Sequence, residues 1–345
     1  MPMKKKLQYQ TLHCHTRTSD GVLTYEQVLE ECKKNNIGVV AFTDHDSLPS
    51  VEKIEELQKL KHDVAFITGI EMSATNVAEV DGKIELFHIV GLFVDPTNND
   101  LIAYCKRASA KRVERTKKII ESCQKLGFEI TYDDVLKHVT GDSVGRPHIA
   151  KAILANEHNI TVIHKLEESL RKESQTKTEL LPLYEKVRQE DIWQKMFSLF
   201  LTDSGYIKHV YEHYEDKVDM DEVVTLIRNA GGIALLAHWS YFKHKLPLNL
   251  VDDFLKEGRL DGVETVYAFG VPDTQFNSFV TDMMDLEVLC EKYNKIKGGG
   301  GDFHKKEDFA YMNNKKFVGF ANRTRNLIEK VLENHPTINR KWSSL

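Results

Sequence analysis

The sequence has few cysteines, no long apolar run and no excess of basic charge, and each absence excludes a class of protein. The five cysteines are an odd number without a C-x-x-C pair, so we expect reduced thiols in a cytoplasmic protein. No apolar stretch approaches the ~18 residues that a membrane span needs. The net charge of −5 gives no whole-chain case for nucleic-acid binding, so any polyanion contact must be local.

The 345 residues exceed a typical single domain, but one (β/α) barrel with an insertion would use them fully. Hydrophobic residues make up 41% of the chain, which is enough to bury a large core. No long segment is rich enough in proline or glycine to indicate disorder. Length and composition therefore favour a folded protein with one large core.

Two parts of the chain alternate strand-like and helix-like patterns. The first is predicted to contain strands at 7–12, 38–42, 64–70 and 84–93 and helices at 24–35 and 49–60. The strand at 84–93 could pair with residues 72–77 across the turn-like Asp81-Gly82. The second is predicted to contain strands at 233–237, 262–267 and from 296 and helices at 220–229, 248–256 and 274–293. Such alternation implies parallel pairing, and a parallel barrel gathers its functional groups at the carboxyl ends of the strands. We predict an α/β fold.

Between these parts, strand signals nearly vanish. We predict that residues 98–217 are a helical cap insertion in a barrel formed by residues 7–97 and 218–304. Insertions of this kind commonly supply substrate contacts and exclude water. The tail, residues 305–345, is weakly patterned and is left unassigned.

Histidine and carboxylate groups are abundant at the ends of the predicted strands. Six short segments carry them: H-C-H-T-R-T-S-D-G, T-D-H-D, G-I-E-M, F-H-I-V-G, L-A-H and G-D-F-H. The candidate ligands in these segments are His13, His15, Asp20, His45, Glu71, His88, His238, Asp302 and His304. A lone histidine is more often a core or surface residue than a ligand. Six repetitions of one placement instead favour a site for two or three divalent metals.

The spacing of the histidines agrees with this prediction. His13 and His15 lie at positions i and i+2 of a strand end and should point the same way, because side chains alternate along a strand. Cys14 would then face the opposite side, where packing is a more common role than ligation. Asp302 and His304 repeat the same spacing after a run of glycines, which lets the backbone approach closely.

The carboxylates admit more than one role. Asp20 follows on a turn and suits either a ligand or a turn or helix N-cap residue. Asp44 or Asp46 could orient a metal-bound His45, since ligating histidines usually need such a partner. Glu71 comes directly after an apolar strand, where it suits a bridge between two metals and would be costly if left unpaired.

Imidazole and carboxylate ligands together suit Mn²⁺, Fe²⁺ or Zn²⁺, and the lack of thiolates argues against a structural zinc site. Two metals ~3.5–4 Å apart can generate a hydroxide and stabilise both oxygens of a phosphoryl transfer. The ligand set therefore points to hydrolytic chemistry on a phosphate ester.

Chemistry on a phosphate also needs cations. Arg146, in the segment G-R-P-H at 145–148, precedes a predicted helix at an anion-binding position, although a surface arginine would fit equally well. A helical stripe at 107–118 carries further basic residues, which are Arg107, Lys111, Arg115 and Lys118. Such a stripe could guide a polyanion, but it is more commonly a solvated face.

Taken together, these segments resemble the PHP (polymerase and histidinol phosphatase) superfamily of metal-dependent phosphoesterases. The resemblance covers about residues 7–96 and 220–304. It is closest to the small phosphoesterases that act on nucleoside 3′,5′-bisphosphates or short oligoribonucleotides. These carry a helical insertion with a G-R-P-H segment. The resemblance implies a distorted (β/α)₇ TIM-like barrel that holds three divalent metal ions (Mn, Fe or Zn).

The resemblance also implies a role for each candidate. The first metal would be held by His13, His15, Glu71 and Asp302. The second would be held by Glu71, His88 and His238, and the third by Asp20, His45 and His304. Arg146 and His148 would face the substrate phosphates from the cap. Three departures concern the pocket: His238-Trp239-Ser240 replaces H-P-G, G-D-F-H replaces S-D-F-H, and the cap has extra residues at about 156–194.

The leading prediction is a phosphoesterase that hydrolyses phosphate monoesters of nucleotides, such as nucleoside 3′,5′-bisphosphates, by metal-activated hydroxide, with Glu71 bridging the metals. A 5′–3′ exoribonuclease acting on short RNA, a histidinol phosphate phosphatase and a non-catalytic metal-stabilised PHP module are the alternatives. The expected partner is a small phosphorylated molecule, with no membrane contact. The sequence does not define the oligomeric state.

Overall fold

The structure is a computed structural model that describes residues 7–60, 62–75, 86–139, 141, 143–212, 218–267, 276–313 and 320–345. The chain divides into two compact units. The first contains Met1–Lys106 and Lys217–Leu345, and the second contains Arg107–Asp216. Each unit has a hydrophobic core of its own.

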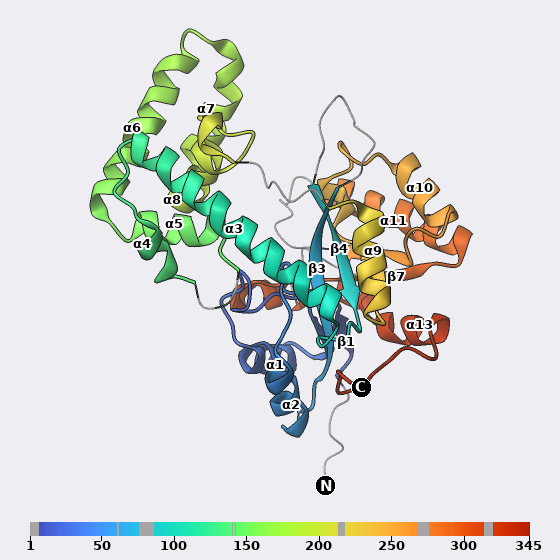
Figure 1. Cartoon of the computed structure of the whole chain (residues 1–345). Helices are drawn as coiled ribbons and strands as arrows, with labels where there is room; N and C mark the ends of the chain where they lie inside the picture. The colour runs from blue at the N-terminus through green and yellow to red at the C-terminus, as the bar shows by residue number, and fades with distance from the viewer. Residues whose placement is uncertain are drawn as a thin grey trace. The chain divides into compact units, whose positions relative to one another are not determined.

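The first unit is built on a seven-stranded sheet whose strands are neighbours in chain order (Figure 1). The strands are β1 (Tyr9–Thr11), β2 (Ile37–Phe42), β3 (Ala65–Thr75), β4 (Leu86–Leu92), β5 (Ile233–Leu236), β6 (Gly262–Tyr267) and β7 (Ile296–Gly300). β3 pairs antiparallel with β4, and β4 pairs antiparallel with β5. The other four pairings are parallel.

Two antiparallel pairings interrupt the parallel pairing that the alternation of strands and helices implies. β4 follows β3 without an intervening helix and therefore runs back alongside it, so β5, which resumes the common direction, is also antiparallel to β4. The pairing of the segment after residue 71 with the strand at 84–93 was predicted and is confirmed. The turn predicted at Asp81-Gly82 lies outside the described residues.

The helices of this unit are α1 (Tyr25–Lys34), α2 (Val51–Lys59), α9 (Met220–Asn229), α10 (Leu248–Lys256), α11 (Phe276–Tyr293), α12 (Phe320–Arg323) and α13 (Leu327–Asn334). Five of them begin and end close to the predicted positions, and α12 and α13 lie in the tail that the sequence left unassigned. Thr24 caps α1 in a capping box with Gln27. α9 contacts β3, β4 and β5 along its apolar face. It approaches β4 closely because Gly91 has no side chain: a Cβ there would lie 2.9 Å from Ile227 Cγ1.

The tail that the sequence left unassigned is part of a core. α13 buries Leu327, Ile328 and Val331 in one apolar cluster with residues from six strands or their ends. The strand residues of this cluster include Leu12, Ala41, Ile67, Val90, Leu235 and Ile296. Polar contacts fix the same helix, since Gln10 Nε2 donates to Glu329 Oε2 (2.8 Å) and Ile328 N donates to Gln10 Oε1 (2.7 Å).

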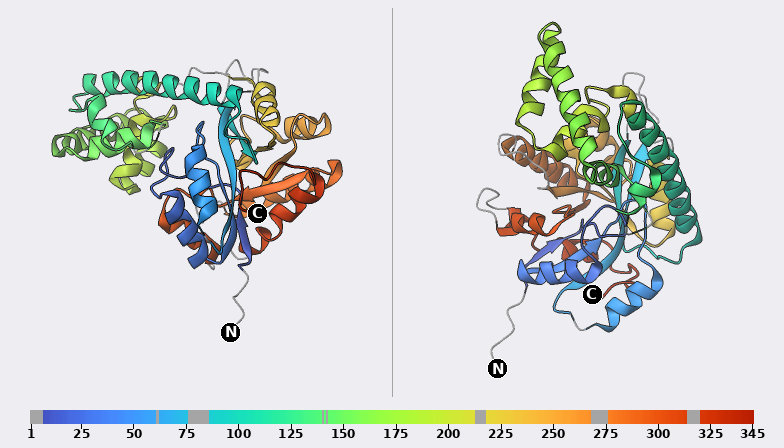
Figure 2. Two further views of the ribbon diagram at one scale, coloured as in Figure 1. Left: turned by 60° about the horizontal axis from the view of Figure 1, so that its bottom comes forward. Right: turned by 90° about the vertical axis from the view of Figure 1, so that its left-hand side faces the viewer.

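The second unit contains helices and no strand among its described residues, 107–139, 141 and 143–212 (Figure 2). Its helices are α3 (Asn99–Lys125, which begins in the first unit), α4 (Tyr132–Leu136), α5 (Arg146–Leu154), α6 (Glu157–Ser174), α7 (Leu181–Gln189) and α8 (Ile192–Met196). α7 and α8 are separate helices, because Asp191 caps the start of α8, and Phe197–Leu201 continues α8 as a π-helix. In the described part of the chain, no helix combines the length and apolarity of a membrane span.

Candidate metal centre

Backbone pairing beyond the ends of β1 and β7 sets the geometry of the site. His15 N donates to Phe303 O (2.9 Å) and Asp302 N donates to His13 O (3.1 Å), so the two i, i+2 pairs lie side by side. Cys14 is buried on the opposite side with Phe303 in an apolar core, as the alternation predicts. Gly300 permits this approach, because a Cβ there would lie 2.5 Å from Thr11 Oγ1.

Four buried side chains converge on one point. His15 Nε2 lies 2.9 Å from Asp302 Oδ1 and 3.2 Å from Glu71 Oε2. His13 Nε2 lies 3.3 Å from each of the same two oxygens and 3.1 Å from His15 Nε2. Two imidazole nitrogens and two carboxylate oxygens thus face one another, and these are the four residues proposed for one metal.

The other carboxylate oxygen of Glu71, Oε1, lies close to a second pair of histidines, His88 and His238. His88 Nδ1 lies 2.9 Å from Glu71 Oε1, and His238 Nε2 lies 2.8 Å from it. His45 Nδ1 approaches Glu71 Oε2 at 2.9 Å. Because its two oxygens face different histidine groups, Glu71 has the arrangement that a bridging carboxylate needs.

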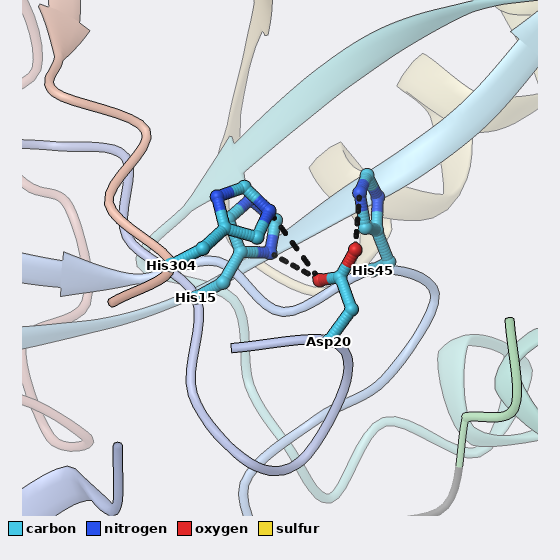
Figure 3. A group of neighbouring side chains, drawn as sticks. All are labelled: His15, Asp20, His45 and His304. Carbon is cyan, nitrogen blue, oxygen red and sulfur yellow. Dashed lines mark ion pairs between the residues drawn. The ribbon is translucent and has the colours of Figure 1, made fainter. Parts of the chain in front are cut away.

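A third group surrounds Asp20 (Figure 3). Its carboxylate oxygens lie 3.5 Å from His304 Nε2, 3.6 Å from His15 Nδ1 and 3.8 Å from His45 Nε2. His15 and His45 each turn their other nitrogen toward Glu71, so both rings stand between two groups of acceptors. The structure brings all nine sequence candidates together, including Asp20, for which a turn or cap role was the alternative.

The donor set fits divalent cations. Glu71 Oε2 and Asp302 Oδ1 are buried and have no hydrogen-bond partner, although imidazole nitrogens lie within ion-pair distance. An oxygen left in this state costs about 1–3 kcal/mol or more when charged. The imidazole and carboxylate atoms of each group lie within 4.8 Å of one another, as ligands of a common ion would. A cation among these atoms would supply the partner that both oxygens lack.

The pKa values of Glu71 and His15 show that the carboxylates of the site are ionised and favour positive charge beside them. Burial alone would raise the pKa of Glu71, but the charges of His45, His88 and His13 hold it well below its usual range. Burial opposes the charged form of His15, yet the nearby carboxylates of Asp302 and Glu71 outweigh it and raise its pKa to about 10. The carboxylates stay ionised, and they draw cations into the site.

Two of the candidate ligands adopt a left-handed backbone conformation. His238 has a φ of 30° and Asp302 a φ of 48°, and Asp46, next to His45, has a φ of 45°. Non-glycine residues rarely adopt these angles, which cost of order 1–3 kcal/mol each and concentrate at functional sites. The fold therefore holds these side chains against a local backbone preference.

Glu264 is a buried residue of this site that the sequence did not reveal. It lies on β6, and its Oε1 is 2.8 Å from His13 Nδ1, while its Oε2 accepts from His238 N at 2.8 Å. By accepting the Nδ1 proton of His13, it directs Nε2 of that ring toward Glu71 and Asp302. The sequence signal was a charged residue inside a buried strand, E in G-V-E-T-V-Y, but no neighbouring histidine marked it.

We expect Glu264→Gln to weaken metal binding by roughly 10- to 100-fold, the usual effect of losing a carboxylate behind a ligating histidine. The amide nitrogen would face a backbone or imidazole donor and leave one hydrogen bond unmade. Titration of the metal-stripped protein in buffered metal solutions measures this effect. Glu257→Gln, at an exposed position after α10, is the matched control. Unchanged affinity for Glu264→Gln would contradict the positioning role.

Asp44 and Asp46 organise the loops around His45. Asp44 accepts from Thr16 N (2.8 Å), Thr16 Oγ1 (2.7 Å) and Ser19 Oγ (2.7 Å), which orders the turn that carries Asp20. Asp46 accepts from Ser73 N at 2.9 Å and from Tyr104 Oη at 2.6 Å. These bonds hold the backbone beside the ligands, and a direct role of either carboxylate at the His45 ring stays a prediction.

Arg146 and His148 lie in the second unit, at the start of α5. His148 is buried, and its Nδ1 accepts from Gly145 N at 3.1 Å, which caps the helix. Arg146 Nη1 donates to Leu201 O at 3.0 Å, and its guanidinium lies 5.4 Å from the centre of the Tyr211 ring. Both residues have clear structural contacts, and their contact with a substrate phosphate stays a prediction.

The predicted basic stripe lies on α3 and is less uniform than the sequence indicates. Lys111 and Lys118 both pair with Glu114, at 3.2 and 3.6 Å. Arg115 is half-buried, and its Nε donates to Glu212 O at 2.6 Å. Only part of the stripe is therefore a solvated basic face.

Comparisons with known proteins agree with this geometry. The family model described as the PHP domain matches residues 11–208. A 3′,5′-nucleoside bisphosphate phosphatase from Chromobacterium violaceum is 23% identical over 296 residues, which are 85% of this chain and 86% of that protein. A 5′-3′ exoribonuclease from Haemophilus influenzae is 32% identical over 143 residues, 41% of this chain and 49% of that protein.

Solved structures share the fold. A protein from Bifidobacterium adolescentis, described as a predicted metal-dependent phosphoesterase, has a TM-score of 0.65 and 22% identity, covering 94% of this chain and 96% of its own. An amidohydrolase from Chromobacterium violaceum, solved with bound sulfate and no metal, has a TM-score of 0.63 and 22% identity, covering 86% and 88%. At this level of identity, the likeness concerns the fold.

Proposed function

The chain belongs to the PHP domain family, and on that premise we propose that it is a metal-dependent phosphoesterase that hydrolyses phosphate monoesters of nucleotides such as nucleoside 3′,5′-bisphosphates. One observation carries the proposal: Glu71 offers its two buried oxygens to two different groups of histidines. The relative named as a bisphosphate phosphatase, which matches over most of both chains, supports the substrate class.

The proposed site holds three divalent ions of Mn, Fe or Zn. His13, His15, Glu71 and Asp302 would hold one, Glu71, His88 and His238 a second, and Asp20, His45 and His304 a third. Bound there, such ions would lower the pKa of water and neutralise charge on phosphate oxygens. The buried oxygens without hydrogen bonds on Glu71 and Asp302 support this assignment.

The protein's own residues have four tasks in this proposal. Glu71 fixes the relation between two histidine groups, and Glu264 fixes the ring of His13. The hydrogen bond from His304 Nδ1 to Asp302 O (2.9 Å) turns the Nε2 of that ring toward Asp20. Arg146 and His148 bind substrate phosphate oxygens, where a guanidinium offers paired donors.

The architecture we propose is a distorted (β/α)₇ barrel with residues 98–217 as its cap insertion. Hydrogen bonds from Leu12 N to Gly299 O (3.0 Å) and from His15 N to Phe303 O (2.9 Å) support closure between β1 and β7. The separate core of Arg107–Asp216 supports an insertion. The five free cysteines support a cytoplasmic setting, where thiols remain reduced.

We expect the protein to bind more than one transition metal per chain when it is purified without chelator. Four groups of neighbouring candidate ligands share members, since His13, His15, His45 and Glu71 each belong to two of them, and this favours occupation of several sites together. Elemental analysis, before and after reconstitution with Mn²⁺, measures the content. One ion or none after reconstitution would contradict a trinuclear centre.

The substrate assignment is tested by mixing the metal-loaded protein with adenosine 3′,5′-bisphosphate, histidinol phosphate and a short 5′-phosphorylated RNA. Release of phosphate and of nucleotides is measured for each. Phosphate release from the bisphosphate at the highest kcat/KM is the expected result. A preference for histidinol phosphate, or no turnover of any of the three, would contradict the proposal.

A 5′–3′ exoribonuclease is the second candidate function. It is favoured by the exoribonuclease relative, which is 32% identical over 143 residues but covers 41% of this chain. Stepwise release of mononucleotides from the 5′ end of the RNA would support it over the phosphatase.

A further inference from the structure

Two arginines of the second unit converge on one tyrosine. The guanidinium carbon of Arg115, on α3, lies 5.1 Å from the centre of the Tyr211 ring, and that of Arg146, on α5, lies 5.4 Å from the same centre. Segments far apart in the sequence thus bring two positive charges to one aromatic side chain. The two charges also act on each other, because the charge of Arg146 lowers the pKa of Arg115.

The hydrogen bonds of the two arginines go to neutral groups. Arg115 Nε donates to Glu212 O (2.6 Å), and Arg146 Nη1 donates to Leu201 O (3.0 Å). Arg115 Nη2 is buried and has no hydrogen-bond partner. Among the residues that the structure describes, neither guanidinium forms an ion pair with a carboxylate. Donors of this pair are therefore available for an anion.

Other cations of the same unit are paired with acids. Arg171 Nε lies 2.6 Å from Glu168, Arg188 lies 2.8 Å from Glu185, and the largely buried Lys195 lies 2.6 Å from Glu167. Arg115 and Arg146 differ from these neighbours although Arg115 is more enclosed than Arg171 or Arg188. Their arrangement is thus not the general pattern of this helical unit.

Electrostatics make the arrangement costly without a ligand. Burial lowers the pKa of Arg115 to about 10, and the charges of Arg146 and Arg112 act in the same direction. A buried charge without an opposite charge destabilises a fold, while an oxyanion can accept paired hydrogen bonds from guanidinium groups. A phosphate group meets both needs, since it carries negative charge and several acceptor oxygens.

We propose that Arg115, Arg146 and Tyr211 form a phosphate-binding site within the second unit. This inference rests on the proposed function and deepens it, because it assigns Arg115 to the recognition of a substrate phosphate beside Arg146. It also gives Arg115 a role in ligand binding, unlike the solvent-exposed basic residues of the same stripe on α3. Two sources carry the required chemistry: the second phosphate of a nucleoside bisphosphate, and a backbone phosphate of a short RNA.

The first test measures binding of inorganic phosphate to the full chain in the presence of chelator, so that metals make no contribution. Phosphate should raise the Tm of the wild-type protein, and Arg115→Gln should abolish the shift. Arg115→Lys, which keeps the charge but loses the paired donors, should show a smaller shift. Arg171→Gln is the control and should respond like the wild type.

Arg115→Gln removes a like-charge interaction but also the hydrogen bond from Nε to Glu212 O, so each shift is measured against the Tm of the same variant without phosphate. If that variant does not fold, the comparison passes to Arg115→Lys. A wild-type Tm that phosphate leaves unchanged, or an Arg115→Gln or Arg115→Lys shift equal to that of the wild type, would overturn the site.

The second test identifies the source of the phosphate with metal-loaded protein. We expect Arg115→Gln to raise KM by roughly 10- to 100-fold for the true substrate, the scale of one charge-assisted hydrogen bond, with little change in kcat. A rise for adenosine 3′,5′-bisphosphate identifies the second phosphate, and a rise for the 5′-phosphorylated RNA identifies a backbone phosphate. Wild-type KM on both would overturn a role in substrate recognition. If wild-type protein hydrolyses neither, the proposed function fails, whereas the phosphate-dependent Tm still decides whether the site exists.

Discussion

Glu71→Gln should lose at least one metal and lower kcat by at least ~10³, because the substitution keeps the size of the side chain but removes the charge that two histidine groups share. The amide would present an N–H₂ group to imidazole nitrogens that now face a carboxylate oxygen. The fold should persist, since the apolar clusters that include Leu12 and Val90 do not involve this residue.

Elemental analysis and steady-state kinetics measure the two effects separately. Glu79, a control that the sequence alone would suggest, lies outside the described residues. Glu55→Gln, at an exposed position on α2, is a suitable replacement and should keep full metal content and turnover. A Glu71→Gln protein with full metal content and normal turnover would contradict the proposal that Glu71 bridges two metals.

Arg146→Ala should weaken catalysis on phosphoesters by roughly 2–4 kcal/mol in transition-state terms, the scale of one lost electrostatic contact with the reacting group. That range corresponds to about 30- to 900-fold in kcat/KM. Metal content should not change, because Arg146 belongs to the second unit and the nine candidate ligands to the first.

Arg146 also donates to Leu201 O, so the thermal unfolding of the variant must be measured beside its kinetics. Arg171→Ala is the matched control, since it removes an arginine that pairs with Glu168 in the same unit. If Arg146→Ala has wild-type kinetics, Arg146 does not bind substrate, and its role is limited to the hydrogen bond with Leu201 O.

The candidate ligands could be predicted because each follows a strand and histidine is informative at that position. The i, i+2 spacing of His13 and His15 needs only the alternation of a strand to place both rings together. Glu264 could not be found in this way, because its partners His13 and His238 are supplied by other strands. Its role depends on strand order, which local patterns do not encode.

The environment of Arg115 and the role of α13 could not be predicted from the sequence, for related reasons. Arg115 shares a stripe with Lys111 and Lys118, and only the packing of α5 and Tyr211 beside α3 separates it from them. α13 has a pattern too short to identify, and its role arises from contacts with strands more than 300 residues earlier, such as that of Glu329 with Gln10. Tertiary contacts decided both cases.

The position of α13 has a consequence for the order in which the protein acquires its structure. The apolar cluster that joins Leu12 to Val331 cannot be completed until nearly the whole chain has left the ribosome. Contacts over such sequence separation form slowly, because a long loop must close before they contribute. The second unit, whose core uses only residues 113–210, has no such requirement and can fold while β5, β6 and β7 are still being made. Until β5, β6, β7 and α13 are made, the apolar side chains of the earlier strands in this cluster lack part of their partners, whereas the core of the second unit lacks none.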